Sequence, residues 1–229
     1  MFRKYLFISL LLLLPALLFS QEIQERKFDS FSKIKITGNM QVMMMVGETP
    51  KIKIESKDLD PDNITTKVED EELIIRMKKS LFQDREVFVT VYFQSISEIT
   101  SLADAEIQFE DPVIQDQFKI KATSGSHIKM ALQTKKLEIE AYQGGQAQLK
   151  GKTDTLDAYV NTGGILSATD LTVQRAKLKL NTGGKGEITV EKSLRARVNT
   201  GANFSYYGKP EITDTNTSLG GTISAWDEK

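Results

Sequence analysis

The sequence predicts an all-β protein that forms a right-handed parallel β-solenoid, preceded by a β-rich N-terminal half. One observation is a repeat of six glycine-centred segments, whose nearly constant period of about 19 residues is typical of stacked supersecondary units. A second observation is that apolar and polar residues alternate on both sides of each glycine, which is the pattern of half-buried strands. The anchoring glycines are Gly125, Gly144, Gly163, Gly183, Gly201 and Gly220.

Each repeat is predicted to contain a strand, a tight turn at the glycine, a second strand and a polar connection. Leu156, Ala158 and Val160 precede Gly163 at alternate positions, and the same alternation resumes after the turn. The residue after each anchor is small in all six repeats, which allows the turns of adjacent rungs to approach closely. Because parallel crossovers are almost always right-handed, we expect a right-handed coil.

Two columns of polar residues accompany the turns. Asn161, Asn181 and Asn199 lie two positions before their glycines, where stacked amides can hydrogen-bond along the axis. We therefore expect a structural asparagine ladder, with a sugar-binding row as the alternative. In the sixth repeat, threonines replace the apolar residues of the first strand, as a cap on an exposed solenoid end would require. They are Thr213, Thr215 and Thr217.

Residues 21–116 are expected to be a β-rich half continuous with a solenoid of about six rungs over residues 117–229. Residues 31–46 copy the strand, glycine, strand pattern around Gly38, and residues 96–109 form a degenerate repeat around Asp104. Further strands are predicted at residues 51–55, 72–77 and 87–93. We expect this half to cover the first rung as a sandwich or meander. The consecutive methionines at 43–45 are interpreted as core packing rather than as a metal cluster.

The N-terminus has the pattern of a secretory signal peptide over residues 1–20. Arg3 and Lys4 precede an apolar run from Leu6 to Phe19, and polar sequence begins at Ser20 and Gln21. The run is short for a membrane span, which favours a cleaved signal peptide. An uncleaved membrane anchor is the alternative. The chain contains no cysteine, which excludes disulfides and a lipid on an N-terminal cysteine. We expect an exported protein in the periplasm, on the outer-membrane surface or outside the cell, with no transmembrane segment after signal removal.

The overall charge gives no argument for nucleic acid as a partner. The formal net charge is −1, and removing residues 1–20 with their two basic residues makes it −3 (28 − 31). Locally, two successive rungs place basic residues in outward positions: Lys177, Lys179, Arg195 and Arg197. Because stacked opposite charges attract across neighbouring strands, a solvated charged face is the first interpretation of these four residues. A groove for an anionic polysaccharide is the alternative.

Aromatic residues gather near the C-terminus, where exposed rings would be able to stack on sugars. Phe204 and Tyr206 have the inward phase of the core. Tyr207 and Trp226 have the outward phase, so they are candidates either for ligand binding or for covering the last rung.

No catalytic residues, metal ligands or cofactors are expected. A glycoside hydrolase needs two carboxylates about 5–9.5 Å apart across a cleft. Asp154, Asp157 and Asp170 are candidates, but nothing in the sequence places the three together in one cleft. A lyase site is approximated only by Asp157 beside basic residues. His127 is the sole histidine, so a histidine-rich metal site is not predicted. A polysaccharide-cleaving β-helix remains the alternative function.

Several motifs together resemble the head GIN domain family, the putative autotransporter adhesin domain of secreted Bacteroidetes proteins. They are the Phe-Ser-Lys-Ile-Lys-Ile-Thr-Gly strand at 31–38 and the Asn-Thr-Gly-Gly motifs at 161–164 and 181–184. The resemblance covers roughly residues 31–223. It implies a β-helical fold and an adhesive or envelope-scaffolding role without enzymatic activity. A cell-surface glycan or an envelope protein is the implied partner, and self-association through the solenoid ends is a third alternative.

Overall fold

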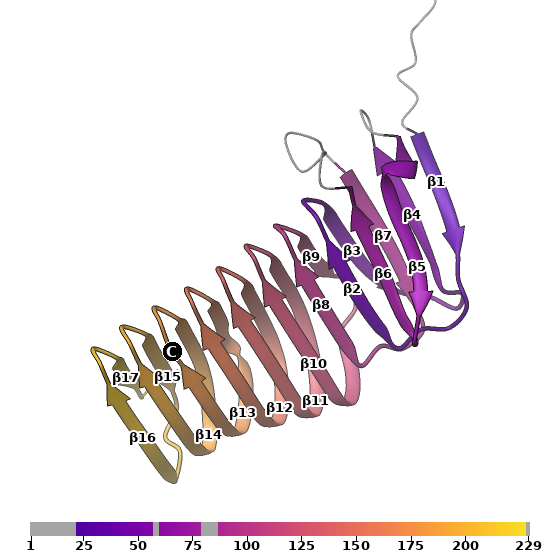
Figure 1. Ribbon diagram of the computed structural model, residues 1–229. Coiled ribbons are helices and arrows are strands. Elements are labelled where there is room, and N and C mark those ends of the chain that lie inside the picture. Colours follow the sequence, from indigo (N-terminus) through magenta and orange to yellow (C-terminus); the bar gives the residue numbers. More distant parts are fainter. Residues whose placement is uncertain (1–21, 57–59, 79–86, 228–229) are drawn as a thin grey trace, which may run out of the picture.

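The computed structural model describes residues 22–56, 60–78 and 87–227. They form an elongated β-solenoid of about seven turns, which confirms the predicted all-β solenoid (Figure 1). The handedness of the coil stays a prediction. The expected signal peptide lies outside the described residues.

The strands are β1 Glu22–Lys27, β2 Lys33–Thr37, β3 Gln41–Val46, β4 Lys51–Ser56, β5 Ile64–Glu69, β6 Glu72–Met77, β7 Val87–Phe93, β8 Glu98–Leu102, β9 Glu106–Phe109, β10 Val113–Thr123, β11 His127–Tyr142, β12 Gln146–Asn161, β13 Ile165–Leu180, β14 Lys185–Asn199, β15 Asn203–Tyr207, β16 Ile212–Ser218 and β17 Thr222–Trp226. A single 3₁₀ turn, Pro61–Asn63, precedes β5 within the described chain.

Two parallel sheets face each other across the core. The leading sheet contains the strands that enter each turn: β6, β2, β8, β10, the second halves of β11 to β14, and β16. The trailing sheet contains the strands that leave each turn: β7, β3, β9, the first halves of β11 to β14, β15 and β17. Long strands such as β11 to β14 cross from one sheet to the other, so each contributes to both.

The core lies between the inward faces of the two sheets, and residue sizes are matched within it. Alternate apolar residues of the strands between the two ends are almost fully buried, such as Ile139 at 1% exposure. Gly186 shows the size matching, because a Cβ there would lie 2.9 Å from Cδ2 of Leu180 and 3.4 Å from Cδ2 of Phe204. The absent side chain at Gly186 thus leaves the space that its two large neighbours fill.

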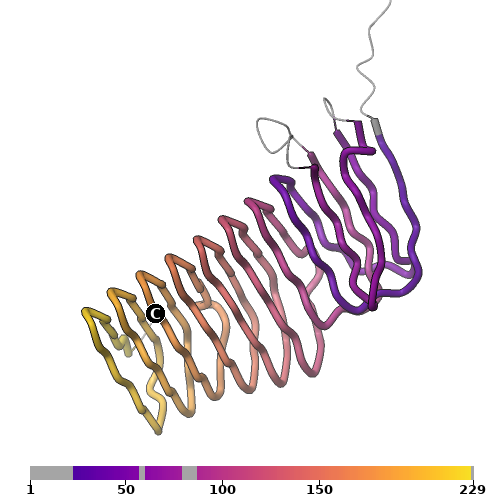
Figure 2. Tube along the Cα trace, viewed as in Figure 1, coloured from indigo at the N-terminus to yellow at the C-terminus, as the bar shows by residue number. Residues whose placement is uncertain are grey.

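The turns form the first edge of the solenoid, uppermost in Figure 2. Each glycine and the residue before it have positive φ, as in a type I′ turn: Thr182 at 46° and Gly183 at 69°. Gly184 N–H closes this turn by donating to the carbonyl of Asn181 at 3.0 Å. Gly183 N–H donates instead to the carbonyl of Thr200 in the next rung, at 3.1 Å. The turns therefore continue the interstrand hydrogen bonding around the edge.

The N-terminal half supplies rungs of the same solenoid rather than a sandwich that covers the first rung. β2 pairs with both β6 and β8, and β3 pairs with both β7 and β9. The predicted rung at residues 31–46 is thus confirmed, but it is inserted between elements that come later in the sequence. The degenerate repeat is also confirmed, because Ala103 and Asp104 have φ of 56° and 60° without a glycine. Met44 is buried in the core, whereas Met43 and Met45 point outward, half-buried.

The two ends of the solenoid are built differently. At the N-terminal end, β5 pairs antiparallel with β6, and β4 and β1 extend the trailing sheet antiparallel. Arg26 of β1 spans the end, donating to the carbonyls of Ile64 at 2.6 Å and Pro61 at 3.0 Å. At the C-terminal end, β16 and β17 each pair on one side only within the described chain. The threonines expected to cap this end are exposed on it.

Candidate functional site

The repeats differ in length, and the extra or missing residues lie at the second edge of the solenoid, opposite the turns. The register of β12 and β13 shifts between Gln148 and Lys150. The register of β13 and β14 shifts between Ala168 and Thr172, and again beyond Val173. The longer and the shorter repeats therefore differ only at this edge, while the turns stay aligned. In repeat proteins, insertions on one face commonly mark the binding face.

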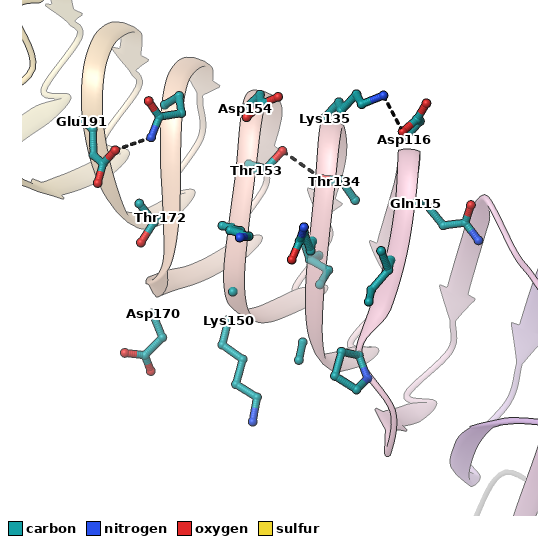
Figure 3. Close-up of a pocket in the computed structure, with 18 residues that line it drawn as sticks. Gln115, Asp116, Thr134, Lys135, Lys150, Thr153, Asp154, Asp170, Thr172 and Glu191 are labelled. Atoms are coloured by element: carbon teal, nitrogen blue, oxygen red, sulfur yellow. Dashed lines mark hydrogen bonds and ion pairs between the residues drawn. The ribbon is translucent and has the colours of Figure 1, made fainter.

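An open groove of about 1610 Å³ runs along this second edge, from β10 to β14 (Figure 3). We call it the edge groove. The residues that line it are Pro112, Ile114, Gln115, Asp116, Ala131, Leu132, Gln133, Thr134, Lys135, Lys150, Gly151, Lys152, Thr153, Asp154, Asp170, Thr172, Gln174 and Glu191.

The floor of the edge groove is a row of threonines over closely packed backbone. Thr134 Oγ1 donates to Thr153 Oγ1 at 2.9 Å, and Thr153 Oγ1 donates to the carbonyl of Thr155 at 3.1 Å. Both Thr134 and Thr153 are buried. Next to them, Gly151 has φ of 116°, and a Cβ there would lie 2.0 Å from the carbonyl oxygen of Leu132. The floor is thus fixed by hydrogen bonds and by close contact between rungs.

One rim of the edge groove carries charged and amide groups at successive rungs. Lys135 Nζ lies 2.9 Å from Oδ1 of Asp116. That hydrogen bond raises the pKa of Lys135, and the charge of Asp154 contributes in the same direction. Further along, the side-chain amide of Gln174 donates to the Glu191 carboxylate. Figure 3 shows Asp116, Lys135, Asp154 and Glu191 along this rim, with Lys150 and Asp170 on the other side.

The carboxylates singled out in the sequence, Asp154, Asp157 and Asp170, are not brought together as one pair. Asp154 and Asp170 both line the edge groove. Lys150 is the register partner of Asp170, so Asp154 lies four residues further along its strand. Four residues correspond to about 13 Å of strand, beyond the roughly 5–9.5 Å that two-carboxylate hydrolysis needs. Asp157, the third candidate, lines a separate depression on the leading sheet.

The basic residues predicted as a ligand site do come together, but with acidic partners. Lys177 Nζ lies 3.4 Å from Oδ2 of Asp157. Asp214 accepts from Arg195 Nε at 3.0 Å and lies 2.9 Å from a guanidinium nitrogen of Arg197. Its hydrogen bond to Arg197, followed by that to Arg195, lowers the pKa of Asp214. Two carboxylates, Asp157 and Asp214, thus offset two of the four positive charges, with Asp214 shared by both arginines. Lys179 continues the strip beside Tyr159 in the register.

Tyr207 and Trp226 lie on the other face of the molecule. They are register partners on β15 and β17 of the trailing sheet, whereas the basic strip lies on the leading sheet. The six side chains predicted as ligand-binding therefore do not form one site. Phe204 is buried, and Tyr206 stacks on it with ring centroids 6.0 Å apart.

The asparagine column is hydrogen-bonded along the axis in its later rungs. Asn199 Nδ2 donates to Asn181 Oδ1 at 3.0 Å, and Ser218 Oγ donates to Asn199 Oδ1 at 2.6 Å. Asn161 Oδ1 is buried and accepts no hydrogen bond. Asn181 and Asn199 are thus engaged by their neighbours in the ladder.

Among the described residues, no group of three or more His, Asp or Glu side chains is placed to hold a metal ion. Within the same residues, no helix has the length and apolarity to cross a membrane. His127 lies on the trailing sheet beside Glu106 in the register.

The fold and the edge groove together define a class: a two-sheet β-solenoid with one structurally uniform edge and one grooved, polar edge. The chain belongs to the family described as "Putative auto-transporter adhesin, head GIN domain", which matches residues 30–210. No curated protein matched the chain.

Several solved structures share the fold. A putative adhesin from Bacteroides fragilis superposes with a TM-score of 0.82 at 18% identity, over 90% of this chain and 96% of that one. A putative adhesin from Parabacteroides distasonis gives a TM-score of 0.71 at 15% identity, with the same coverage of 90% and 96%. A putative lipid binding protein from the same species gives 0.69 at 18% identity, again covering 90% and 96%. At these identities the likeness concerns the fold.

Proposed function

We propose that this protein is an exported, non-enzymatic adhesin-like module that binds surface glycans in the edge groove. The observation that carries the proposal is the edge groove itself, an open groove that crosses several rungs and carries polar side chains on both sides. Glycans are extended chains of hydroxyl groups, which hydrogen-bond well to amide, carboxylate and ammonium side chains. Gln133, Lys152 and Asp154 present these three kinds of group along the groove. Membership in a family described as adhesins supports the same role.

The lining of the edge groove also indicates how strong the binding is. No residue that lines it is aromatic, so sugar stacking does not contribute there. We therefore expect weak binding that depends on several sugar units, with affinity that rises with glycan length. An envelope scaffold would differ, because it would hold a protein partner and show no dependence on glycan length.

A glycan array with purified residues 21–229 tests this proposal. Gln133→Ala combined with Lys152→Ala removes two exposed groove side chains and should abolish most of the signal. The matched control replaces Lys177, Lys179, Arg195 and Arg197 with Gln and should retain it. The reverse result would assign binding to the basic strip. Absence of any glycan signal from the parent protein would reject the glycan proposal.

Polysaccharide cleavage is the second candidate, because Asp154 and Asp170 line the same groove. Incubating the bound glycans with the protein and measuring new reducing ends distinguishes the two functions. We expect none, since the register places the two carboxylates too far apart along the sheet. Product formation that disappears in Asp154→Asn would make the protein a hydrolase instead.

Export to the envelope or beyond is also part of the proposal. It is supported by the charged, apolar, polar order of residues 1–20. The intact mass of the protein recovered from the producing cells tests it. A mass that begins at Gln21 is expected, and a mass that retains residues 1–20 would indicate a membrane anchor.

A further inference from the structure

The C-terminal end of the solenoid has the properties of an interface. Within the described chain, β16 and β17 have no neighbour on their outer sides, so both sheets end in open strand edges. Open edges are templates for pairing with another chain. Three of the eight exposed large apolar side chains of the described residues also belong to this last rung: Ile212, Leu219 and Trp226, at 65%, 81% and 54% exposure.

The open strand edges at the C-terminal end carry few charged side chains that would oppose pairing with another chain, whereas the strands at the N-terminal end carry several. β17 contains no charged residue, and the only one in β16 is Asp214, which Arg195 and Arg197 already pair. At the N-terminal end, β1 has the sequence EIQERK, and β5 contains Lys67 and Glu69. Charged side chains on an edge strand are a common device against edge-to-edge pairing. The device is thus present at one end and absent at the other.

We propose that the C-terminal end pairs with the same end of a second copy of this chain, through β16 with β16 and β17 with β17, both antiparallel. In β16, an antiparallel register centred on Thr215 places Asp214 opposite Asn216 of the second copy. No like charges meet in this register. In β17, a register centred on Ser224 places Ile223 opposite Ala225, so that apolar residues meet.

A single two-fold axis satisfies both registers. The last turn closes with Gly221 N–H donating to the carbonyl of Ser218 at 2.9 Å, so residues 218 and 221 lie opposite each other. Counting outward from that pair, Thr215 lies at the level of Ser224. An axis normal to the sheets thus passes near both centres. Because such a contact is isologous, it closes after two copies instead of growing into a fibre.

A second copy fits this end better than the N-terminal end of a neighbouring copy does. Head-to-tail stacking would place the last rung, whose only charged strand residue is Asp214, against β1, β5 and the Arg26 side chain that crosses between them. The Arg26 guanidinium and the charged side chains of β1 would then be buried against apolar Leu219 and Trp226. Burying charges without new partners is costly, so the proposed assembly is a closed dimer.

Light scattering during size-exclusion chromatography of residues 21–229 tests the proposal directly. The expected mass is twice that of one chain, independent of added glycan. Ser224→Lys places two ammonium groups opposite each other at the two-fold axis and should give a monomer. Ser205→Lys is the matched control: Ser205 lies in the same column one rung earlier and has strands on both sides, so the dimer should persist.

Two variants with opposite charges at residue 224 distinguish loss of dimerisation from loss of folding. Ser224→Lys and Ser224→Glu should each be monomeric with an unchanged circular dichroism spectrum, and mixing them should restore the dimer. Three outcomes would overturn the proposal: a monomeric parent protein, a dimer that survives Ser224→Lys, or a series of growing oligomers. A dimer without glycan binding would leave this inference intact while rejecting the proposed function.

Discussion

The two glycines of one turn are required for different reasons. Gly163 has φ of 71°, and a Cβ there would meet nothing within 4 Å. Gly164 follows without positive φ, but its Cβ would lie 2.1 Å from the carbonyl oxygen of Ala141 in the rung before. The first glycine is thus needed for its backbone conformation and the second for the close approach of two rungs.

This difference predicts unequal effects of the same substitution. Gly163→Ala forces a residue with a Cβ into the left-handed region, which costs about 1–2 kcal/mol. Gly164→Ala forces two backbones apart, and we expect a loss of more than about 2 kcal/mol in the free energy of unfolding. Urea denaturation of both variants measures the difference. Equal losses would show that the second position is not limited by the neighbouring rung.

Asp214 provides a prediction on pH. Its pKa is lowered in the folded protein, chiefly by the hydrogen bond to Arg197. Its contribution to stability is therefore present above the pKa of the unfolded chain and is lost as the pH falls through the lowered folded value. NMR titration of the carboxyl group should show that Arg197→Gln raises the pKa of Asp214. An unchanged value would mean that Arg195 or another group sets it. Because the pair is exposed, added salt should weaken the effect.

Within an element, stability depends on matching large and small residues between neighbouring strands. Gly186 on β14 lies against Leu180 and beneath Phe204 of the next rung. Gly186→Val should destabilise the protein by about 1–3 kcal/mol through overpacking. Phe204→Leu introduced with it should recover part of that loss, because the smaller side chain vacates space. A double-mutant cycle from thermal unfolding measures this coupling, and strict additivity would contradict the proposed contact.

Sequence periodicity was sufficient for the features that repeat. The strands, the turns at Gly125 to Gly220 and the continuous apolar columns follow from alternation and a nearly constant step. The degenerate turn at Ala103–Asp104 was also predictable, because it falls at the expected place in the repeat although glycine is missing. Thr134 and Thr153 lie one repeat apart in the sequence, which was a usable signal for the groove floor.

Features that depend on non-local pairing were not predictable in the same way. A single turn at Gly38 marks a rung but does not show which rungs lie on either side of it. The edge groove runs past the register shifts at Gln148–Lys150 and Ala168–Thr172, which appear only when the strands are paired. Outward phase placed Tyr207 and Lys177 alike on the surface, but did not show that they belong to different sheets.

At the scale of the whole molecule, stability should follow complete rungs. Deleting residues 145–163 joins Gly144 to Gly164 and removes one complete repeat. Since each rung contacts chiefly its neighbours, we expect this variant to fold, with a cooperative thermal transition and a shorter edge groove. Deleting residues 145–153 is the control, because it breaks the register and should prevent folding. Loss of folding in both would show that the rungs are not interchangeable.

The insertion of β2 and β3 between β6–β7 and β8–β9 has a consequence for how the chain reaches its final form. Synthesis delivers the N-terminal segment first, yet its full set of neighbours arrives only once residues up to Phe109 have emerged. The solenoid therefore cannot lengthen in the order in which the polypeptide appears. Pulse-labelled hydrogen exchange during refolding should show β2 and β3 gaining protection no earlier than β8 and β9. Earlier protection of β2 would mean that a provisional N-terminal assembly forms and later opens to admit the next rung.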